Sequence, residues 1–272
     1  MDTTSGPTAP NPAETYDHYL GPAIFQPLST FMLERAAPRA GERVLDLACG
    51  TGIVTHQLPP LVGESGKVVG VDVAPPMLAI ASAKDAPTGC AIEFRQGNGC
   101  ALVELDNGSF DLVLCQQGLQ FFPERDTGAS EMRRVLASGG RAVVACWRSL
   151  EHQGLFQQLV ETQARLLDIP LDKAAMPFSF GDADALKTTL EDAGFASVEI
   201  VEHEITARFP EPDKFVRLTT ASAASVMPQF AAIDLDQAVA QVANMLAPVI
   251  AHYTKDDHIV VPMITNVAIA RR

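Results

Sequence analysis

Two glycines and a buried acid stand close together in the first third of the chain. Asp46 lies inside the apolar run 44–47, and Gly50 and Gly52 follow within a few positions. A carboxylate in an otherwise apolar segment is costly unless a partner compensates it. Glycines let the backbone turn sharply and approach a ligand closely. This spacing favours a ligand-binding loop, although a bare G-x-G also occurs in many structural turns.

A second acid, Asp72, stands near the end of the next apolar segment, 67–73. Gly52 and Asp72 are 20 positions apart, about the separation at which an acid at a strand end meets a nucleotide ribose. Backbone amides at the start of a helix expected from Ile53 would point at the same ligand. Two acids and a glycine loop together predict a nucleoside ligand with a cationic end.

A parallel sheet is needed to bring these residues together. Apolar runs predict strands over 44–47, 67–73, 91–96, 109–115, 141–147, 198–209 and 258–271. Apolar periodicity and caps predict helices over 13–20, 24–37, 53–61, 124–136 and 152–168. A further helix is expected to begin at Pro75, another to end at Gly194, and most of 211–251 is expected to be helical. Because helices alternate with strands, we expect an α/β fold with a doubly wound, mostly parallel sheet.

The first motif resembles that of class I S-adenosylmethionine (SAM) methyltransferases, in particular the group that acts on small molecules such as quinone precursors. The resemblance rests on the stretch Asp46-Leu47-Ala48-Cys49-Gly50-Thr51-Gly52 and extends over about residues 40–147. It implies a Rossmann-like sheet of seven strands, the last antiparallel, in one domain over 13–272. Segments 149–181 and 210–256 then look like cap insertions over a substrate pocket. The Pro- and Ser/Thr-containing tail 1–12 is expected to be mobile.

The same resemblance implies how the chain would hold the cofactor. Asp46 would face the methionine ammonium through water, and Asp72 would bind the ribose hydroxyls. Asn98 stands where relatives commonly have an acid, and its amide oxygen can still accept from the adenine amino group. Other positions would surround the adenine, contact the methionine part by backbone groups, or place a tyrosine near the carboxylate. The full expected set is Tyr16, Asp46, Ala48, Cys49, Gly50, Gly52, Asp72, Val73, Met77, Asn98, Gly99, Cys100, Cys115 and Gln116.

The acceptor side is less defined. His152 lies just past the fifth expected strand, where ligands bind in open α/β sheets, and is the first candidate for a general base. The competing interpretation is an exposed histidine at a helix start; His18 and Tyr19 are second candidates. Substrate contacts are expected from Tyr19, Gln117, Gln120 and Phe121. The apolar cap segments suggest a small, fairly hydrophobic acceptor, without a choice between carbon, oxygen and nitrogen.

Composition limits the partners. The net charge of -13 disfavours nucleic acid as a substrate, and no apolar run long enough for a membrane span is expected. The five cysteines form no C-x-x-C pair, so free thiols in a cytoplasmic protein are expected and a metal site is not. No signal peptide is visible. Monomer and homodimer both stay open.

Two alternative functions stay open. One is a protein of the same fold that binds SAM without methyl transfer, such as a cyclase or a binding subunit, because its cofactor motifs would be identical. The other is a nicotinamide-dependent oxidoreductase. Thr55 stands where the third glycine of the dinucleotide fingerprint would be, which argues against that class.

Overall fold

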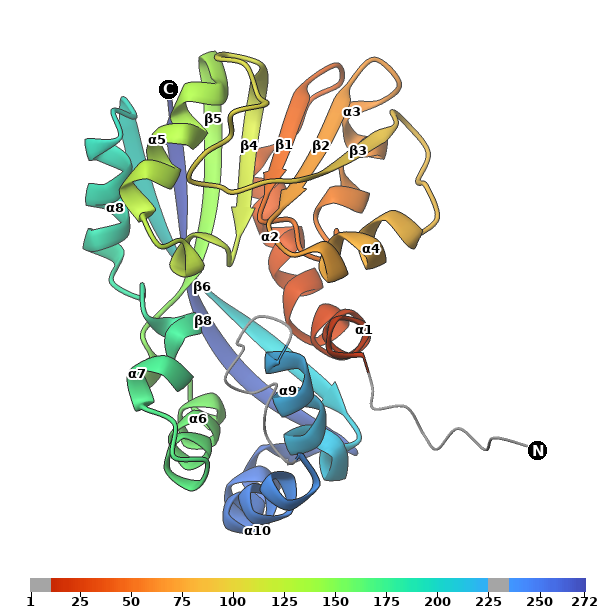
Figure 1. The fold of residues 1–272 in the computed structure, drawn as a ribbon, viewed down its shortest axis with the longest axis vertical. Coiled ribbons are helices and arrows are strands. Elements are labelled where there is room, and N and C mark those ends of the chain that lie inside the picture. The colour runs from red at the N-terminus through yellow and green to blue at the C-terminus, as the bar shows by residue number, and fades with distance from the viewer. Residues whose placement is uncertain (1–10, 225–234) are drawn as a thin grey trace, which may run out of the picture.

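The computed structural model describes residues 11–224 and 235–272. Within them, one sheet has the strand order β3-β2-β1-β4-β5-β8-β6, and a short strand β7 pairs with β8 (Figure 1). Neighbouring strands from β3 to β5 are parallel, whereas β8 is antiparallel to β5 and β6. The strands are β1 (Arg43–Leu47), β2 (Lys67–Asp72), β3 (Ile92–Gln96), β4 (Phe110–Gln116), β5 (Leu136–Trp147), β6 (Ser197–Pro210), β7 (Thr254–Lys255) and β8 (His258–Arg271). The predicted fold is confirmed, and two-residue β7 is an addition to the seven expected strands.

Both faces of the upper sheet are covered, which explains why its strands read as continuous apolar runs. Val44 and Leu112 pack with α2 (Gln26–Ala36) on one face, and Leu45 and Val113 pack with α5 on the other. The remaining helices are α1 (Pro12–Thr15), α3 (Pro59–Val62), α4 (Pro75–Ala83), α5 (Arg125–Val135), α6 (Leu155–Leu166), α7 (Leu171–Ala174), α8 (Ala183–Asp192), α9 (Phe215–Ala223) and α10 (Leu235–Tyr253). None of the helices in the described ranges is long and apolar enough to cross a membrane.

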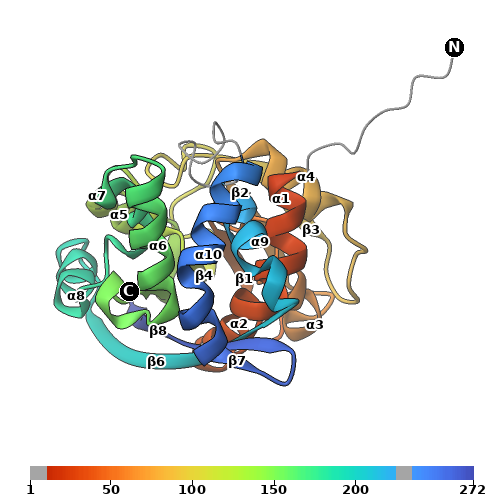
Figure 2. The same ribbon diagram turned by 90° about the horizontal axis from the view of Figure 1, so that it is seen from below.

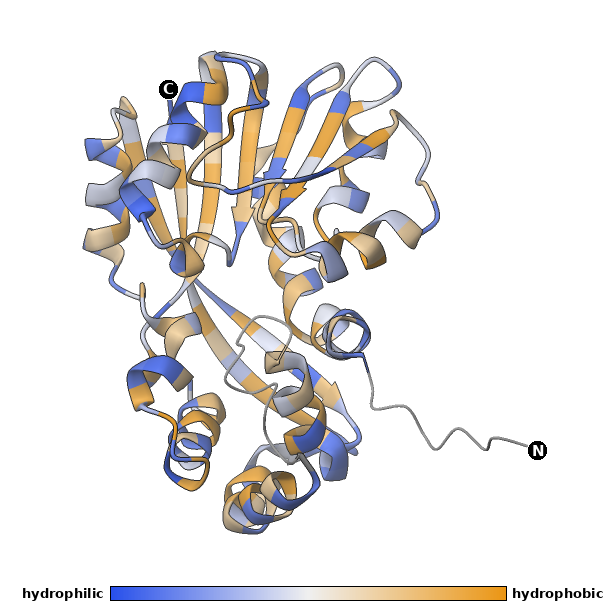
Figure 3. Ribbon diagram, in the orientation of Figure 1, coloured by the Kyte–Doolittle hydropathy of each residue, from blue (hydrophilic) through white to orange (hydrophobic). Residues whose placement is uncertain are grey.

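The long strands β6 and β8 continue below the rest of the sheet, where they pair only with each other and with β7 (Figure 1). Helices α6, α10, α9 and α1 lie next to one another across this lower end (Figure 2). Figure 3 shows orange, apolar residues along the strands and on α6 and α10. Rings of Phe156, Phe209 and Phe215 meet there with centroids 5.2 to 6.0 Å apart. The apolar core on the α2 face of the sheet therefore continues into the lower part of the molecule.

Of these helices, α6, α9 and α10 belong to the segments 149–181 and 210–256, of which 225–234 lie outside the described residues. Their role as a cap, and a single domain over 13–272, stay predictions. Of the expected tail 1–12, only Asn11 and Pro12 are described; Asn11 caps α1 by accepting from the amide of Ala13.

Two helix predictions are wrong. The N-terminal part does not form two separate helices: α1 continues through a π-helix, Tyr16–Phe25, into α2. Pro22 lies inside that π-helix, and the wider turns accommodate a residue that has no N–H to donate. The other error concerns 53–61, where a 3₁₀ turn, Thr55–Gln57, precedes α3. Pro59 and Pro60 begin α3 rather than end a helix, because proline is tolerated in the first turn.

Candidate functional site

A cavity of about 490 Å³ opens at the carboxyl ends of β1, β2 and β4. The strand order reverses between β1 and β4, and ligands of open α/β sheets bind at such a reversal. The upper wall comes from the loops after these strands. The lower wall comes from α6, α9, β8 and the segment after α7, with the side chains of Phe156, Leu159, Val160, Phe178, Thr219 and Met263.

The cavity brings together most of the residues expected from the sequence. It is lined by Tyr16, Ala48, Gly50, Asp72, Val73, Met77, Asn98, Gly99, Gln116, Gln117, Gln120 and Phe121. It is not lined by Tyr19, Asp46, Cys49, Gly52, Cys100, Cys115 or His152. The residues of the second group therefore have no direct contact with the cavity.

In the glycine loop, Gly50 and not Gly52 faces the cavity. Both have positive φ angles, +55° and +78°. A Cβ added to Gly50 would meet no atom within 4 Å, whereas one added to Gly52 would lie 2.9 Å from the ring of His56 and 3.2 Å from Ala81. Gly52 therefore serves the close packing of the loop against α4, which corrects its expected contact with the methionine part of the cofactor.

Asp72 connects the end of β2 to the glycine loop. One carboxylate oxygen accepts from the amide of Gly50 and the other from the amide of Ala74, both at 2.8 Å. The side chain is 9% exposed. Burial raises the pKa of Asp72, and the bonds from the backbone amides oppose that rise. Asp72 thus holds the loop in place and keeps a carboxylate on the cavity wall.

Asp46 lies behind the glycine loop. It is 1% exposed and accepts from the hydroxyl of Thr55 at 2.5 Å. Burial raises the pKa of Asp46 from 3.8 to about 7, and the negative charge of Asp72 adds to the rise, while the bond from Thr55 opposes it. Near neutral pH this carboxyl therefore carries a proton for part of the time.

We expect Asp46 to make folding stability depend on pH. Because its pKa is raised on folding, the folded chain holds a proton that the unfolded chain releases between about pH 4 and pH 7. Stability from this group is therefore greatest below about pH 4 and falls as the pH rises toward 7. Asp46→Asn keeps an acceptor for Thr55 and carries no charge. Its melting temperature should exceed that of the wild type by roughly several degrees at about pH 8 and match it at about pH 4.

Thermal unfolding followed by circular dichroism at a series of pH values measures this difference. All other titrating groups are common to both proteins, so the difference isolates Asp46. Parallel pH profiles for the two proteins would contradict the raised pKa.

At the expected adenine end, Asn98 has a local partner. Its side-chain oxygen accepts from the amide of Cys100 at 2.9 Å, and one lone pair stays free for a second donor. Gly99 packs closely on Phe122, since an added Cβ would lie 2.3 Å from the ring. The Cys100 thiol donates to the carbonyl of Glu124 at 3.3 Å. Met77 is 3% exposed, whereas Val73 is 67% exposed.

The other two cysteines assigned to the cofactor are packing residues. Cys115 is fully buried in the core, and burial raises the pKa of its thiol to about 12. Burial likewise raises the pKa of Cys49, whose sulfur lies against β2 near Gly70. Neither thiol lines the cavity, so any contact with a ligand would have to come from their backbone groups.

The two N-terminal tyrosines have different surroundings. Tyr16 lines the cavity and stacks on Phe25, with ring centroids 4.9 Å apart; burial raises its pKa, and the charge of Asp72 adds to the rise. Tyr19 instead packs on Phe209 and donates to the carbonyl of Pro210 at 3.4 Å. The expected substrate contact of Tyr19 is therefore replaced by a role in the lower core. His18 is exposed and does not line the cavity.

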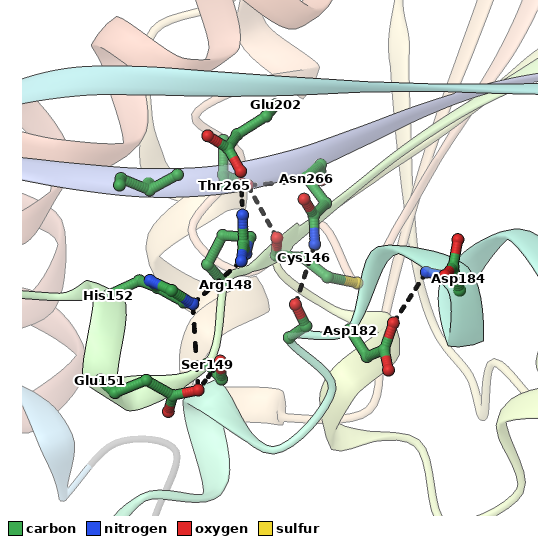
Figure 4. Close-up of polar contacts among 12 residues, drawn as sticks. Cys146, Arg148, Ser149, Glu151, His152, Asp182, Asp184, Glu202, Thr265 and Asn266 are labelled. Carbon is green, nitrogen blue, oxygen red and sulfur yellow. Dashed lines mark hydrogen bonds and ion pairs between the residues drawn. The ribbon is translucent and has the colours of Figure 1, made fainter.

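His152 lies outside the cavity. It ends a 3₁₀ turn, Leu150–His152, and its side chain is 40% exposed. Its Nε2 lies 2.9 Å from a guanidinium nitrogen of Arg148 and 3.9 Å from Glu151 (Figure 4). Arg148 also pairs with Glu202. The ring thus belongs to a surface cluster, and its geometry favours the exposed histidine over the general base.

We therefore expect His152→Gln to methylate at the wild-type rate. The side chain has no contact with the cavity, so neither SAM affinity nor turnover should change by more than about twofold, compared with the hundredfold or larger loss typical of a missing base. Turnover measured between about pH 5 and pH 9 should give superimposable profiles for the two proteins. A lost acid limb in the variant would restore His152 as the base.

Most of the lower wall comes from segments 149–181 and 210–256, which the sequence indicated, but the sequence did not show which of their side chains line the cavity. Phe156, Leu159 and Val160 belong to the buried stripe of α6, which looks like ordinary core packing until the fold places it beside the loops. The one signal in that helix is Gln163, an amide in an apolar stripe. It is 4% exposed and donates to the hydroxyl of Thr220 at 2.8 Å.

Comparison with known proteins decides between the classes that share this fold. A family model, the ubiE/COQ5 methyltransferase family, matches residues 22–162. A demethylmenaquinone methyltransferase of Lactococcus lactis is 35% identical over 192 residues, which cover 63% of this chain and 72% of that protein. The chain belongs to the UbiE/COQ5 methyltransferase family.

As a member of the UbiE/COQ5 family, the protein is a SAM-dependent methyltransferase. A nocamycin O-methyltransferase of Saccharothrix syringae is 27% identical over 244 residues, covering 85% of this chain and 86% of that protein. The crystal structure of YcgJ from Bacillus subtilis has the same fold, with a TM-score of 0.58 and 16% identity over 90% of this chain and 97% of that one. The expected cofactor, fold and enzyme class are confirmed.

Proposed function

We propose that the protein methylates a small, mostly apolar acceptor with an electron-rich ring of the quinol type, bound against the lower wall of the cavity. The observation that carries this proposal is the chemistry of that wall. Among the described residues that line the cavity, the titratable side chains are Tyr16 and Asp72, both placed with the upper, cofactor end. The lower wall offers apolar side chains, hydroxyls and an amide, without an acid or a base.

The upper wall fits SAM. Gly50 leaves open space where any side chain would stand, and Asp72 offers a carboxylate next to it. We assign the ribose hydroxyls to Asp72, the adenine to Val73, Met77 and Asn98, and the methionine part to backbone groups of Ala48, Gly50 and Gln116. Asp46, from behind the loop, would favour the cationic end of the cofactor through its charge.

When bound, SAM supplies an electrophilic methyl group. The protein's contribution is to align the acceptor with that methyl group and to exclude water from both. Because no acid or base of the described residues lines the acceptor end, the acceptor itself must be nucleophilic. The ring carbons of a hydroquinone meet this demand, whereas those of the oxidised quinone are electron-poor.

The relative from L. lactis is named for demethylmenaquinone, which supports a quinol ring as the acceptor. Methylation of a hydroxyl is the second candidate. It is favoured by the nocamycin O-methyltransferase, whose alignment covers more of this chain, 85% against 63%.

Methyl transfer from SAM with a ¹³C-labelled methyl group tests the proposal. The protein is incubated with a naphthohydroquinone kept reduced, with 1-naphthol, or with no acceptor, and S-adenosylhomocysteine (SAH) is quantified. Acceptor-dependent SAH and a product signal typical of a methyl group on a ring carbon are expected. A methoxy signal would favour the second candidate. SAH at the acceptor-free level with every ring compound would contradict the proposal.

A further inference from the structure

A chain of hydrogen bonds runs from the centre of the sheet to the wall of the cavity. It starts at Thr265 of β8, which is fully buried. The Thr265 hydroxyl donates to the carbonyl of Cys146 at 2.9 Å (Figure 4), and the carbonyl of Asn266 lies at 3.4 Å. A carbonyl can only accept, so the single hydroxyl proton is committed to the backbone in either case. The oxygen of Thr265 is left to act as an acceptor.

Because the Thr265 oxygen can only accept, it fixes the orientation of the next two side chains. Gln117 lies 3.0 Å from the Thr265 oxygen and must present its NH₂ group there. Its own oxygen then faces Gln120, which must also present NH₂, again at 3.0 Å. The two ends of an amide are nearly alike in shape, so the bonding network decides the orientation. We call Thr265, Gln117 and Gln120 the amide relay; its polarity is fixed from the backbone outward.

The relay ends in an acceptor without a partner. Gln120 is 2% exposed and lines the cavity. Its Oε1 has no hydrogen-bond partner among the described residues. A buried polar atom left unpaired costs about 1–3 kcal/mol, so native proteins seldom keep one without a use. Because the relay fixes the orientation, the amide cannot exchange its oxygen and its NH₂ group without losing the bond to Gln117.

The backbone supports the same interpretation. Gln117 has a φ of +55°, a left-handed conformation that is strained for a residue with a side chain. Its amide is held by the carbonyl of Ala145 at 2.9 Å. Strained residues of this kind gather at binding sites, where the surrounding structure maintains them. Here the strained turn places the Gln117 side chain between β8 and Gln120.

Gln116 has a similar arrangement with a different use. Its NH₂ group donates to the carbonyl of Phe25 at 3.1 Å, and its Oε1 is also unpartnered. Because we place the methionine part of SAM beside the backbone of Gln116, the ammonium of SAM would be the donor nearest to this side-chain oxygen. The oxygen of Gln120 has no such donor from the cofactor in our assignment.

We infer that the amide relay is a specificity device, in which Gln120 accepts a hydrogen bond from a hydroxyl or N–H group of the methyl acceptor. The inference rests on the proposed function in that it takes the ligand of this part of the cavity to be the acceptor. An ether or a ketone oxygen at the same place cannot donate, so it would face the Gln120 oxygen without a hydrogen bond. The relay would therefore select a phenol over its methyl ether, and a hydroquinone over its quinone.

Binding of matched ligands tests the relay without turnover. Wild-type protein saturated with SAH is titrated with 1-naphthol and with 1-methoxynaphthalene in a calorimeter. Because the ether leaves Gln120 unpaired, we expect the Kd of 1-naphthol to be at least about tenfold lower. Gln120→Met, similar in shape and apolar, should bring the two Kd values within about twofold.

Three further variants locate the effect. Thr265→Val removes the group that orients Gln117, so it should reduce the preference, and Thr265→Ser, which keeps the hydroxyl, should restore it. Gln57→Met removes an amide that bonds to the Ser29 hydroxyl and does not line the cavity, so it should retain the wild-type ratio. The Kd of SAH, measured for every variant, should stay unchanged, which separates this effect from damage to the cofactor site.

The relay is overturned if wild-type protein binds the two ligands equally, including the case in which it binds neither, or if Gln120→Met keeps the preference. The proposed function is judged separately, by acceptor-dependent SAH formation. A preference for 1-naphthol without methyl transfer to any ring compound would support the relay and contradict the proposed function. Methyl transfer without a preference for 1-naphthol would support the proposed function and contradict the relay.

Discussion

Asp72→Ala is expected to raise the Kd of SAM about a hundredfold or more. Hydrogen bonds to a charged group contribute about 1.5–3 kcal/mol each, and the proposed ribose contact comprises two of them. Each loss of about 1.4 kcal/mol raises the Kd about tenfold. The structure adds a second loss. The same carboxylate holds the amides of Gly50 and Ala74, both at 2.8 Å, so its removal also loosens the loop.

Two variants separate these contributions. Asp72→Asn keeps one oxygen for a backbone amide and loses the charge, so its Kd should fall between those of the wild type and Asp72→Ala. Asp111→Ala is the matched control, because Asp111 likewise accepts from a backbone amide, that of Arg43 at 2.9 Å, and pairs with the Arg43 side chain. It does not line the cavity. Calorimetry showing an unchanged Kd for Asp72→Ala would remove the ribose assignment.

Gly50→Val should abolish measurable SAM binding in a folded protein. A side chain at this position meets no protein atom within 4 Å, so it would extend into the space that we assign to the cofactor. The left-handed backbone, with φ at +55°, adds a conformational cost of about 1–2 kcal/mol. We expect the Kd to rise by about a hundredfold or more, together with a modest loss of thermal stability.

Gly139→Val provides the control for the backbone cost. Gly139 has a φ of +76° and equally open surroundings, but it lies near the start of β5, away from the cavity. The two variants should lose similar stability, whereas only Gly50→Val should lose SAM. Normal SAM affinity in Gly50→Val would mean that the cofactor does not pass beside this loop.

The sequence predicted the sheet well because its signals are local. Apolar runs bounded by glycine and proline located each long strand, and β8 spans the expected residues 258–271. The helix expected to end at Gly194 is α8, whose N-cap Asp182 accepts from the amides of Asp184 and Ala185. Such features depend on neighbours along the chain, which the sequence shows directly.

The errors share a different origin. Whether Gly50 or Gly52 faces the ligand depends on how the loop packs against α4, which no local pattern contains. His152 follows the fifth strand as expected, but a 3₁₀ turn directs it to Arg148 on the surface. The amide relay joins Gln117 to a threonine 148 positions later in the chain. Gln116, Gln117 and Gln120 were expected at the site from the sequence. Thr265, which orients Gln117 and through it Gln120, could be identified only from the fold.

Strand β8 is one continuous element that joins the two halves of the molecule. Its second half pairs with β5 inside the sheet, and its first half pairs with β6 beside the lower helices. A hinge between the halves would have to break this two-stranded ladder, because both β6 and β8 pass through the junction without interruption. The lower wall therefore cannot swing open as a lid on that side. The same ladder holds Thr265, so the residue that orients the amide relay keeps a constant position relative to the sheet.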